Sequence, residues 1–225
     1  MKTVAAACLI SLSLAQAAEN KLPAFRISPV PYASPVANEQ RKAAQAQHGE
    51  ALKLLLDGNL KEARTAFQKV LNLSPNNPAA LMNLGIVEQR LSNFSEAERL
   101  LRRAVQASPN SGAGWLLLGV ASLEQQKNEA AFAHFAQAVY LDSKNPQAHL
   151  YLAVVLARKS WKTAAEDEFR RALELDDRIA DAHYNLAVLY LQHAPPAIEL
   201  ARRHYQRALD LGAAADSAVA AQLDN

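Results

Sequence analysis

A small residue recurs every 34 positions along most of this chain, and this spacing limits the fold more than any other feature. Alanine or glycine stands at Ala51, Gly85, Gly119, Ala153 and Ala187. Repetition of a unit of about 20 to 50 residues is typical of solenoids, in which each unit packs on its neighbours. The sequence therefore predicts tandem repeats of one structural unit.

Small and large residues occupy fixed places within each unit. The units are counted from residues 44, 78, 112, 146 and 180, so that the recurring small residue is position 8. Position 20 is alanine throughout, after a slip of two residues in the last unit, and position 24 is always bulky: Phe67, Leu101, Phe135, Phe169 or Tyr205. Small residues let two antiparallel helices approach, and large residues fill the space between them. Each unit is thus predicted to be a helical hairpin. Gln125 lies outside this pattern, and its replacement by leucine is expected to be nearly neutral.

The third unit resembles the tetratricopeptide repeat most closely. Trp115, Leu118 and Gly119 match the first-helix pattern W-x-x-L-G of that family, and Ala131 and Phe135 match the second-helix pattern A-x-x-x-F. The resemblance implies an all-α fold, a right-handed α-solenoid of antiparallel helix pairs, with five repeats over residues 39–213. No stretch alternates in the manner of a half-buried strand.

The two ends of the array depart from the pattern. Glu50 stands where the other units have leucine, so the first repeat is expected to have an exposed face, through which two copies of the chain would pair as a homodimer. The last unit carries an insertion around Ala194, Pro195 and Pro196. Residues 214–225 are predicted to be a C-terminal capping helix or tail.

The N-terminal residues have the composition of an export signal. Lys2 precedes an apolar run over residues 4–14, and Ala15-Gln16-Ala17 has the small-x-small form of a cleavage site. We expect residues 1–17 to be a cleavable signal peptide and the mature protein to be periplasmic or secreted, in a bacterium. The run is too short to cross a bilayer, and no second apolar run follows, so no integral membrane span is expected.

Cysteine and proline complete the N-terminal prediction. Cys8 is the only cysteine, and it lies inside the predicted signal, which excludes disulfides and cysteine metal sites from the mature chain. Its alternative role, as a lipoprotein cysteine, is disfavoured because the apolar stretch before it is too short. Four prolines between Pro23 and Pro35 predict a linker over residues 18–38. The alternative is a docking motif made by the apolar residues Phe25, Ile27, Val30 and Tyr32.

Charge and histidine placement exclude several function classes. A formal net charge of +2 does not indicate a nucleic-acid surface. His149 and His183 occupy position 4 of neighbouring units, within reach of a shared ion, but this is a packing position and two histidines make a poor metal site. The sequence has no nucleophile elbow, phosphate-binding loop or His-Glu-x-x-His motif. We therefore expect no catalytic residue, no metal, no cofactor and no enzyme activity.

The resemblance also implies where a partner would bind. In the family, positions 2, 5, 6, 9, 12 and 13 of each first helix face a concave groove, and asparagine at position 6 pairs with the backbone of an extended peptide. Asn83 and Asn185 occupy that position here. The expected groove is a largely apolar strip with polar edges, made by Met82, Asn83, Ile86, Arg90, Leu116, Val120, Leu150, Tyr151, Val154, Arg158, Tyr184, Asn185 and Val188.

The predicted function is therefore a non-catalytic interaction scaffold or adaptor in the cell envelope, which binds a protein or peptide segment in this groove. The alternative is an accessory subunit that positions an envelope enzyme or a secretion or pilus-type assembly. It would use an outer basic face that includes Arg102, Arg103, Arg170 and Arg171.

Overall fold

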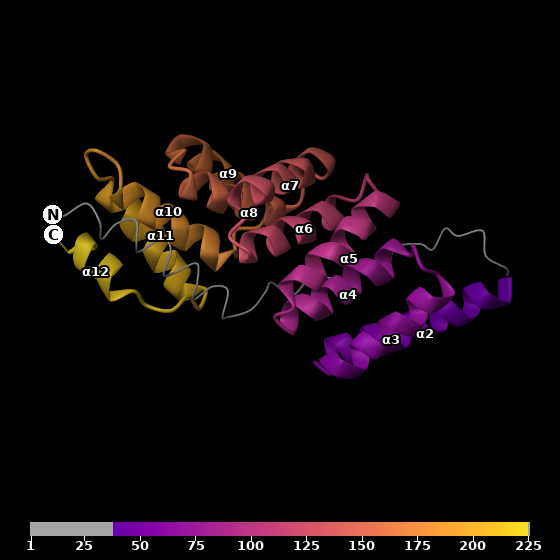
Figure 1. Ribbon diagram of the computed structural model, residues 1–225. Helices are drawn as coiled ribbons and strands as arrows, with labels where there is room; N and C mark the ends of the chain where they lie inside the picture. The colour runs from indigo at the N-terminus through magenta and orange to yellow at the C-terminus, as the bar shows by residue number, and fades with distance from the viewer. Residues whose placement is uncertain (1–37, 225) are drawn as a thin grey trace. The chain divides into compact units, whose positions relative to one another are not determined.

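The computed structural model describes residues 38–224, which form eleven helices and no strand (Figure 1). The predicted all-α fold is confirmed. The predictions for the signal peptide, for Cys8 and for most of the proline-rich linker lie outside the described residues.

The described residues fall into two compact units, 38–142 and 143–224. The first unit is built from three antiparallel helix pairs, α2 with α3, α4 with α5 and α6 with α7, and α3 also contacts α4 as α5 contacts α6. Its helices are α2 (Asn38–Leu56), α3 (Leu60–Leu73), α4 (Pro78–Arg90), α5 (Phe94–Ala107), α6 (Gly112–Glu124) and α7 (Asn128–Leu141).

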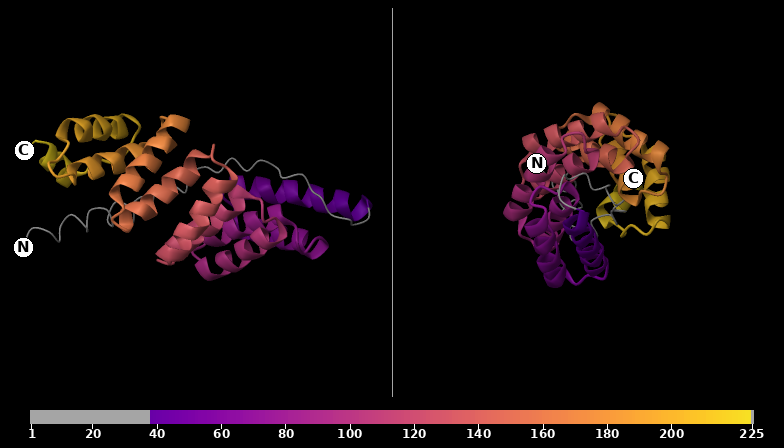
Figure 2. Two further views of the ribbon diagram at one scale, coloured as in Figure 1. Left: turned by 90° about the horizontal axis from the view of Figure 1, so that it is seen from above. Right: turned by 90° about the vertical axis from the view of Figure 1, so that its right-hand side faces the viewer.

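The second unit contains two helix pairs and a short terminal helix (Figure 2). α8 pairs with α9 and α10 pairs with α11, while α9 contacts α10, and α12 contacts both helices of the last pair. These helices are α8 (Pro146–Arg158), α9 (Lys162–Leu175), α10 (Ala180–Leu191), α11 (Ile198–Asp210) and α12 (Ser217–Leu223). In the following, the first helices are α2, α4, α6, α8 and α10, and the second helices are α3, α5, α7, α9 and α11.

Capping residues fix the start of several first helices. The side chain of Asn77 accepts a hydrogen bond from the Ala80 amide at 3.1 Å, and proline follows it as the first helical residue. Asn145 repeats this arrangement before α8. Proline has no amide proton to lose and a backbone angle already suited to helix, so Asn-Pro is a strong helix start.

The core of each pair depends on the small and large positions that the sequence repeats. Phe67, Phe135 and Phe169 are completely buried between the two helices of their pairs. Gly119 faces Phe135 so closely that a Cβ atom placed on the glycine would lie 2.4 Å from the ring. The packing of this pair thus leaves no room for a side chain at Gly119.

Candidate functional site

The first helices of unit 38–142 bury most of the predicted groove residues. Met82, Ile86, Leu116 and Val120 have exposed fractions between 0% and 7%, and Asn83 is also buried. Arg90, at position 13, is exposed. The apolar side chains at these groove positions are therefore packed inside the unit.

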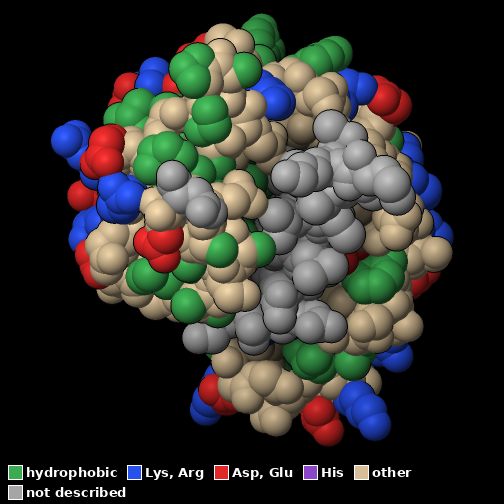
Figure 3. Space-filling model, turned by 90° about the vertical axis from the view of Figure 1, so that its left-hand side faces the viewer, with side chains coloured by type: hydrophobic (Ala, Val, Ile, Leu, Met, Phe, Trp, Pro, Cys, Tyr) green, Lys and Arg blue, Asp and Glu red, His purple; other side chains and the backbone are tan. Residues whose placement is uncertain are grey.

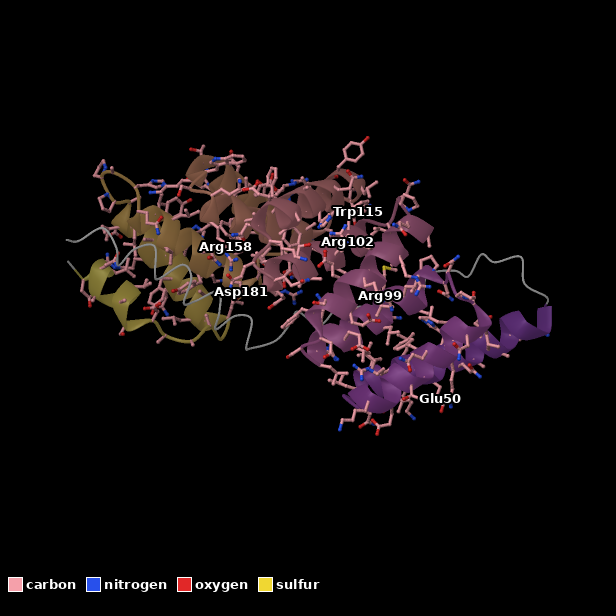
Figure 4. The ribbon with its side chains drawn as sticks, in the orientation of Figure 1. Glu50, Arg99, Arg102, Trp115, Arg158 and Asp181 are labelled. Carbon is pink, nitrogen blue, oxygen red and sulfur yellow. The ribbon has the colours of Figure 1, made fainter. Side chains whose placement is uncertain are left out.

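Unit 143–224 repeats this distribution. Leu150, Val154 and Val188 are buried, and Tyr184 and Asn185 are each 9% exposed. Tyr151 is half-buried, while Arg158 is exposed (Figure 4). The apolar side chains at the predicted groove positions are thus buried in both units.

Both asparagines at position 6 already make hydrogen bonds within the chain. The amide nitrogen of Asn83 lies 3.3 Å from Nε2 of His48. The amide nitrogen of Asn185 donates to the backbone carbonyl of Asp181 at 2.7 Å. A side-chain amide has two N–H groups and one carbonyl oxygen, so each of these bonds uses one of the two N–H groups of its asparagine.

Three buried polar atoms at groove positions have no hydrogen-bond partner in the described part of the chain. They are Nδ1 of His48 at position 5, Nε2 of Gln89 at position 12 and Oε1 of Gln147 at position 2. A fourth such atom, Oε1 of Gln47, also belongs to a first helix. Buried polar atoms without partners are rare in folded proteins, and each one calls for a cause.

The proton on His48 can be placed by the contact with Asn83. Burial lowers the pKa of His48, so its ring is neutral at pH 7. An amide nitrogen only donates, so Nε2 of His48 accepts and Nδ1 carries the proton. The unpartnered atom of His48 is therefore a donor, as is the amide nitrogen of Gln89.

Buried glutamates connect successive repeats. Glu88 on α4 accepts from Arg64 on α3 at 2.7 Å. Glu98 on α5 accepts from Gln125 at 2.8 Å and from Lys127 at 2.6 Å, and both of these residues belong to the next repeat. The sequence did not reveal these contacts, because the partners lie 24 to 29 residues apart.

The arginines of the proposed basic face are engaged within the protein. Arg102 pairs with Glu98 and Arg170 with Glu166, each one helical turn away, while Arg171 pairs with Glu174. Arg103 donates to the carbonyl of Pro75 at 2.8 Å. Basic and acidic side chains are also interspersed on the face drawn in Figure 3. These pairings disfavour a free cationic surface.

The side chain at position 4 contacts the backbone of the loop that precedes its helix. The ring nitrogens of Trp115, His149 and His183 lie 2.8 to 3.1 Å from the carbonyl oxygen of the residue six places earlier. The other side of each ring meets the second helix of the same pair. His149 Nδ1 lies 2.5 Å from Glu168, and His183 Nδ1 lies 2.9 Å from Nδ1 of His204.

These contacts correct the idea that His149 and His183 hold one ion between them. Each histidine pairs within its own hairpin, as the packing interpretation expects. Among residues 38–224, no group of three or more His, Cys, Asp and Glu side chains is placed to hold a metal ion. Within the same range, no helix has the length and apolar character needed to cross a membrane.

Tandem antiparallel helix pairs with this packing define the chain as an α-helical repeat protein. Residues 48–111 and 82–146 match the tetratricopeptide repeat family model. Together with the fold, this match makes the chain a tetratricopeptide-repeat protein, as its third repeat suggested.

Solved structures of repeat proteins share the fold. PilF of Pseudomonas aeruginosa aligns over 82% of this chain and 83% of its own, with 19% identity and a TM-score of 0.74. YrrB, described as a TPR protein with an unusual peptide-binding site, aligns over 84% and 99%, with 22% identity and a TM-score of 0.63. MamA aligns over 72% and 93%, with 20% identity and a TM-score of 0.63. No curated protein matches the chain in sequence.

Proposed function

We propose that this protein is a non-catalytic adaptor that binds an extended segment of a partner protein along its first helices. The tetratricopeptide repeat is in general a protein-interaction fold without catalytic activity. Specific support comes from the accessible side chains at groove positions: Arg90 and Arg158 are exposed, and Tyr151 is half-buried.

An extended peptide carries a carbonyl acceptor and an amide donor on every residue. In unit 38–142, the exposed guanidinium of Arg90 would donate to such a carbonyl. In unit 143–224, taken by itself, the exposed guanidinium of Arg158 would do the same, and Tyr151 would contact the side chains of the partner.

Site-specific photo-crosslinking tests this proposal. A benzoylphenylalanine at Tyr151, on a first helix, is expected to form an adduct with one dominant protein in native cells. The matched control places the same group at Glu174, an exposed residue on the second helix α9, and should give no such adduct. Adducts from Glu174 alone would contradict the proposal. Aspartate at Leu116 or Val120 is not a suitable test, because both side chains are buried and the charge would unfold the repeat.

The proposal includes export from the cytosol. It rests on the signal-like residues 1–17 and predicts a mature N-terminus at Ala18. N-terminal sequencing of the protein from fractionated cells is expected to find that end in the envelope or medium. Recovery of the protein in the cytosol with Met1 intact would exclude export, and the protein would then be a cytosolic adaptor.

Pairing of two copies through α2 also remains part of the proposal. Glu50 is exposed on this helix (Figure 4), and Leu56 at its end is 74% exposed. Light scattering of the mature chain is expected to give twice the monomer mass, and Leu56→Asp is expected to restore the monomer mass. A monomer at all concentrations would exclude this pairing.

A further inference from the structure

The C-terminal helix α12 is held by a small number of specific contacts. It has seven residues, too few to be stable alone in water. Val219 and Leu223 are buried, with exposed fractions of 1% and 5%, and they lie one helical turn apart on the helix face toward α10 and α11. At the end of the helix, Arg202 donates to the carbonyl of Leu223 at 2.5 Å. The helix therefore exists because the last hairpin supplies its contacts.

Asp216 is the residue that the hairpin recognises. Its Oδ1 caps α12 by accepting from the amides of Ala218 and Val219. Its Oδ2 accepts from the hydroxyl of Tyr184 at 2.7 Å. The hydroxyl of Tyr205 accepts from the Asp216 amide at 2.6 Å and donates to its carbonyl at 3.0 Å. Two tyrosines thus bind both the carboxylate and the backbone of a single residue.

The carboxylate is bound in its charged form. Burial would raise the pKa of Asp216, but the hydrogen bonds from Tyr184, Val219 and Ala218 outweigh it and lower that pKa. A helix that served only to cover the end of the array would need apolar contacts alone. Recognition of an aspartate by Tyr184, a residue at groove position 5, is a more selective arrangement.

We propose that Tyr184, Tyr205 and Arg202 form a docking site for a short helical segment of a partner protein, and that residues 213–224 occupy this site in cis. The partner segment would begin with aspartate as its N-cap and carry apolar residues three and seven positions later, as Asp216, Val219 and Leu223 do. This inference rests on the proposed adaptor function and names a second, helical class of partner segment.

When the chain's own C-terminal segment occupies the site, it blocks access of a partner segment. A segment tethered by a short link has an effective local concentration in the millimolar range. A partner in solution must compete with it, and its apparent affinity falls by the fraction of molecules in which the site is open. The link to α12 is short and has only small side chains. It consists of Gly212, which is in a left-handed conformation, and three alanines. The segment can therefore leave without disturbing α10 and α11.

A peptide in trans tests the site. The full chain carrying Val219→Asp and Leu223→Asp would release its own α12, because both side chains are buried. A fluorescent peptide of residues 213–225 is expected to bind this variant in an anisotropy titration, and to bind the wild-type chain at least about tenfold more weakly. In the peptide, Asp216→Ala should cost about tenfold in affinity, whereas the control Gln222→Ala, at an exposed position, should cost nothing.

Several results would overturn this inference. Absence of peptide binding to a variant that circular dichroism finds folded would do so. If that variant fails to fold, the milder full-chain variant Asp216→Asn takes its place, and failure of both to bind the peptide has the same meaning. A wild-type dimer that dissociates on Val219→Asp would assign the site to a second copy of the chain. Crosslinks from Tyr151 without peptide binding would leave the adaptor function standing and remove this site alone.

Discussion

At the scale of single residues, the distance between the two helices of a pair depends on one glycine and one aromatic ring. A Cβ atom at Gly119 would meet the rigid ring of Phe135, whereas at Gly85 it would meet Leu101 at 2.7 Å, a side chain that can rotate away. Gly49, in α2, has no neighbouring heavy atom within 4 Å of such a Cβ. The present packing therefore leaves no space for a Cβ atom at Gly119 and open space for one at Gly49.

Gly119→Ala is expected to destabilise the protein by about 1 to 3 kcal/mol, because the methyl group overpacks the hairpin against Phe135. The control Gly49→Ala should stabilise by about 0.5 to 1 kcal/mol, since alanine is a better helix former and meets no obstacle. Thermal and urea denaturation of both variants measure this difference. Equal effects would contradict the packing assigned to Gly119.

Glu98 is the clearest electrostatic tie between two repeats. Burial opposes its charge, yet hydrogen bonds from Lys127, Arg102 and Gln125 dominate and lower its pKa from 4.5 to about 2. A carboxyl whose pKa is lower in the folded state stabilises the protein above its unfolded pKa. This stabilisation is lost as the pH falls from 4.5 towards 2.

Glu98→Gln is accordingly expected to cost about 1 to 3 kcal/mol at pH 7 and progressively less below pH 4.5. Glu96→Gln is the control, because Glu96 is more exposed and pairs only with Arg99 three residues along, so it should cost less than about 0.5 kcal/mol. Urea denaturation at pH 7 and at pH 3 measures both. A Glu98→Gln penalty that does not change between these pH values would refute the assigned ion pairs.

At the scale of elements, the turn inside each hairpin uses a left-handed residue at position 15 in the first four repeats. Gly58 fills it in the first repeat, but Ser92, Gln126 and Ser160 fill it in the next three, with φ near +60°. Residues with a side chain pay about 1 kcal/mol for this conformation, and glycine does not. Three hairpins thus carry a small backbone strain at an equivalent point.

Gln126→Gly is therefore expected to stabilise the protein by about 0.5 to 1 kcal/mol. Its backbone amide would keep the turn hydrogen bond to the carbonyl of Leu123. Ala133→Gly, at an exposed position inside α7, is the control and should destabilise by about 1 kcal/mol. Thermal melts of the two variants should shift in opposite directions, and a lower melting temperature for Gln126→Gly would contradict the turn geometry.

The hairpin of α10 and α11 contains a pair of histidines that responds to pH. Burial lowers the pKa of His183 and, together with the positive charge of neighbouring groups, that of His204. The charged and titratable groups around the two rings are Asp177, Arg207, Arg170, Glu166 and Tyr190. Because both pKa values are below 6.5 in the folded state, the unfolded chain takes up protons first. The contribution of the two histidines to the free energy of unfolding is complete above pH 6.5 and is lost as the pH falls below that value.

His204→Asn tests the histidine pair. The asparagine amide takes roughly the place of Nδ1 and can donate to His183, but it does not titrate. The fall in melting temperature between pH 7.5 and pH 5.5 is expected to shrink but not to vanish, because the pKa values of His183, His48 and His134 are also lowered in the folded state. An unchanged pH response would show that the pair does not control it.

At the scale of the whole molecule, stability in a repeat array comes from contacts between neighbours. α4 contacts both helices of the first repeat as well as α5 and α6, whereas α2 contacts only α3 and α4 among the pairings that involve several residues. In such arrays the terminal repeats open first, because they have fewer neighbours. The terminal repeats are expected to be less protected than the repeats between them.

Hydrogen exchange measures this gradient. Backbone amides in the middle of α2 are expected to exchange at least about tenfold faster than those in the middle of α4, which corresponds to about 1.4 kcal/mol of opening free energy. Both exchange rates are measured in the same sample, so the ratio does not depend on the solution conditions. Equal protection would indicate that the first repeat has a further neighbour in solution, such as a second copy.

More of the fold than of the candidate site could be predicted from the sequence. The 34-residue period placed Gly119 opposite Phe135 and predicted the helix pairs, because the size of a side chain at a fixed helical position is a local property. The same pattern predicted which residues stand at groove positions. It did not predict that Leu116 and Val120 are buried, because accessibility depends on everything that packs around a residue.

The sequence by itself determined that this is a tetratricopeptide array of paired helices, because the helical period and the places of small and large side chains can be read directly from it. Only the tertiary structure decided which polar groups meet. Gln125 was expected to be replaceable, yet it donates to Glu98 across a repeat boundary. His183 pairs with His204 and not with His149, and Tyr184 binds Asp216. These contacts join residues 20 or more positions apart and depend on side-chain direction, which no local pattern specifies.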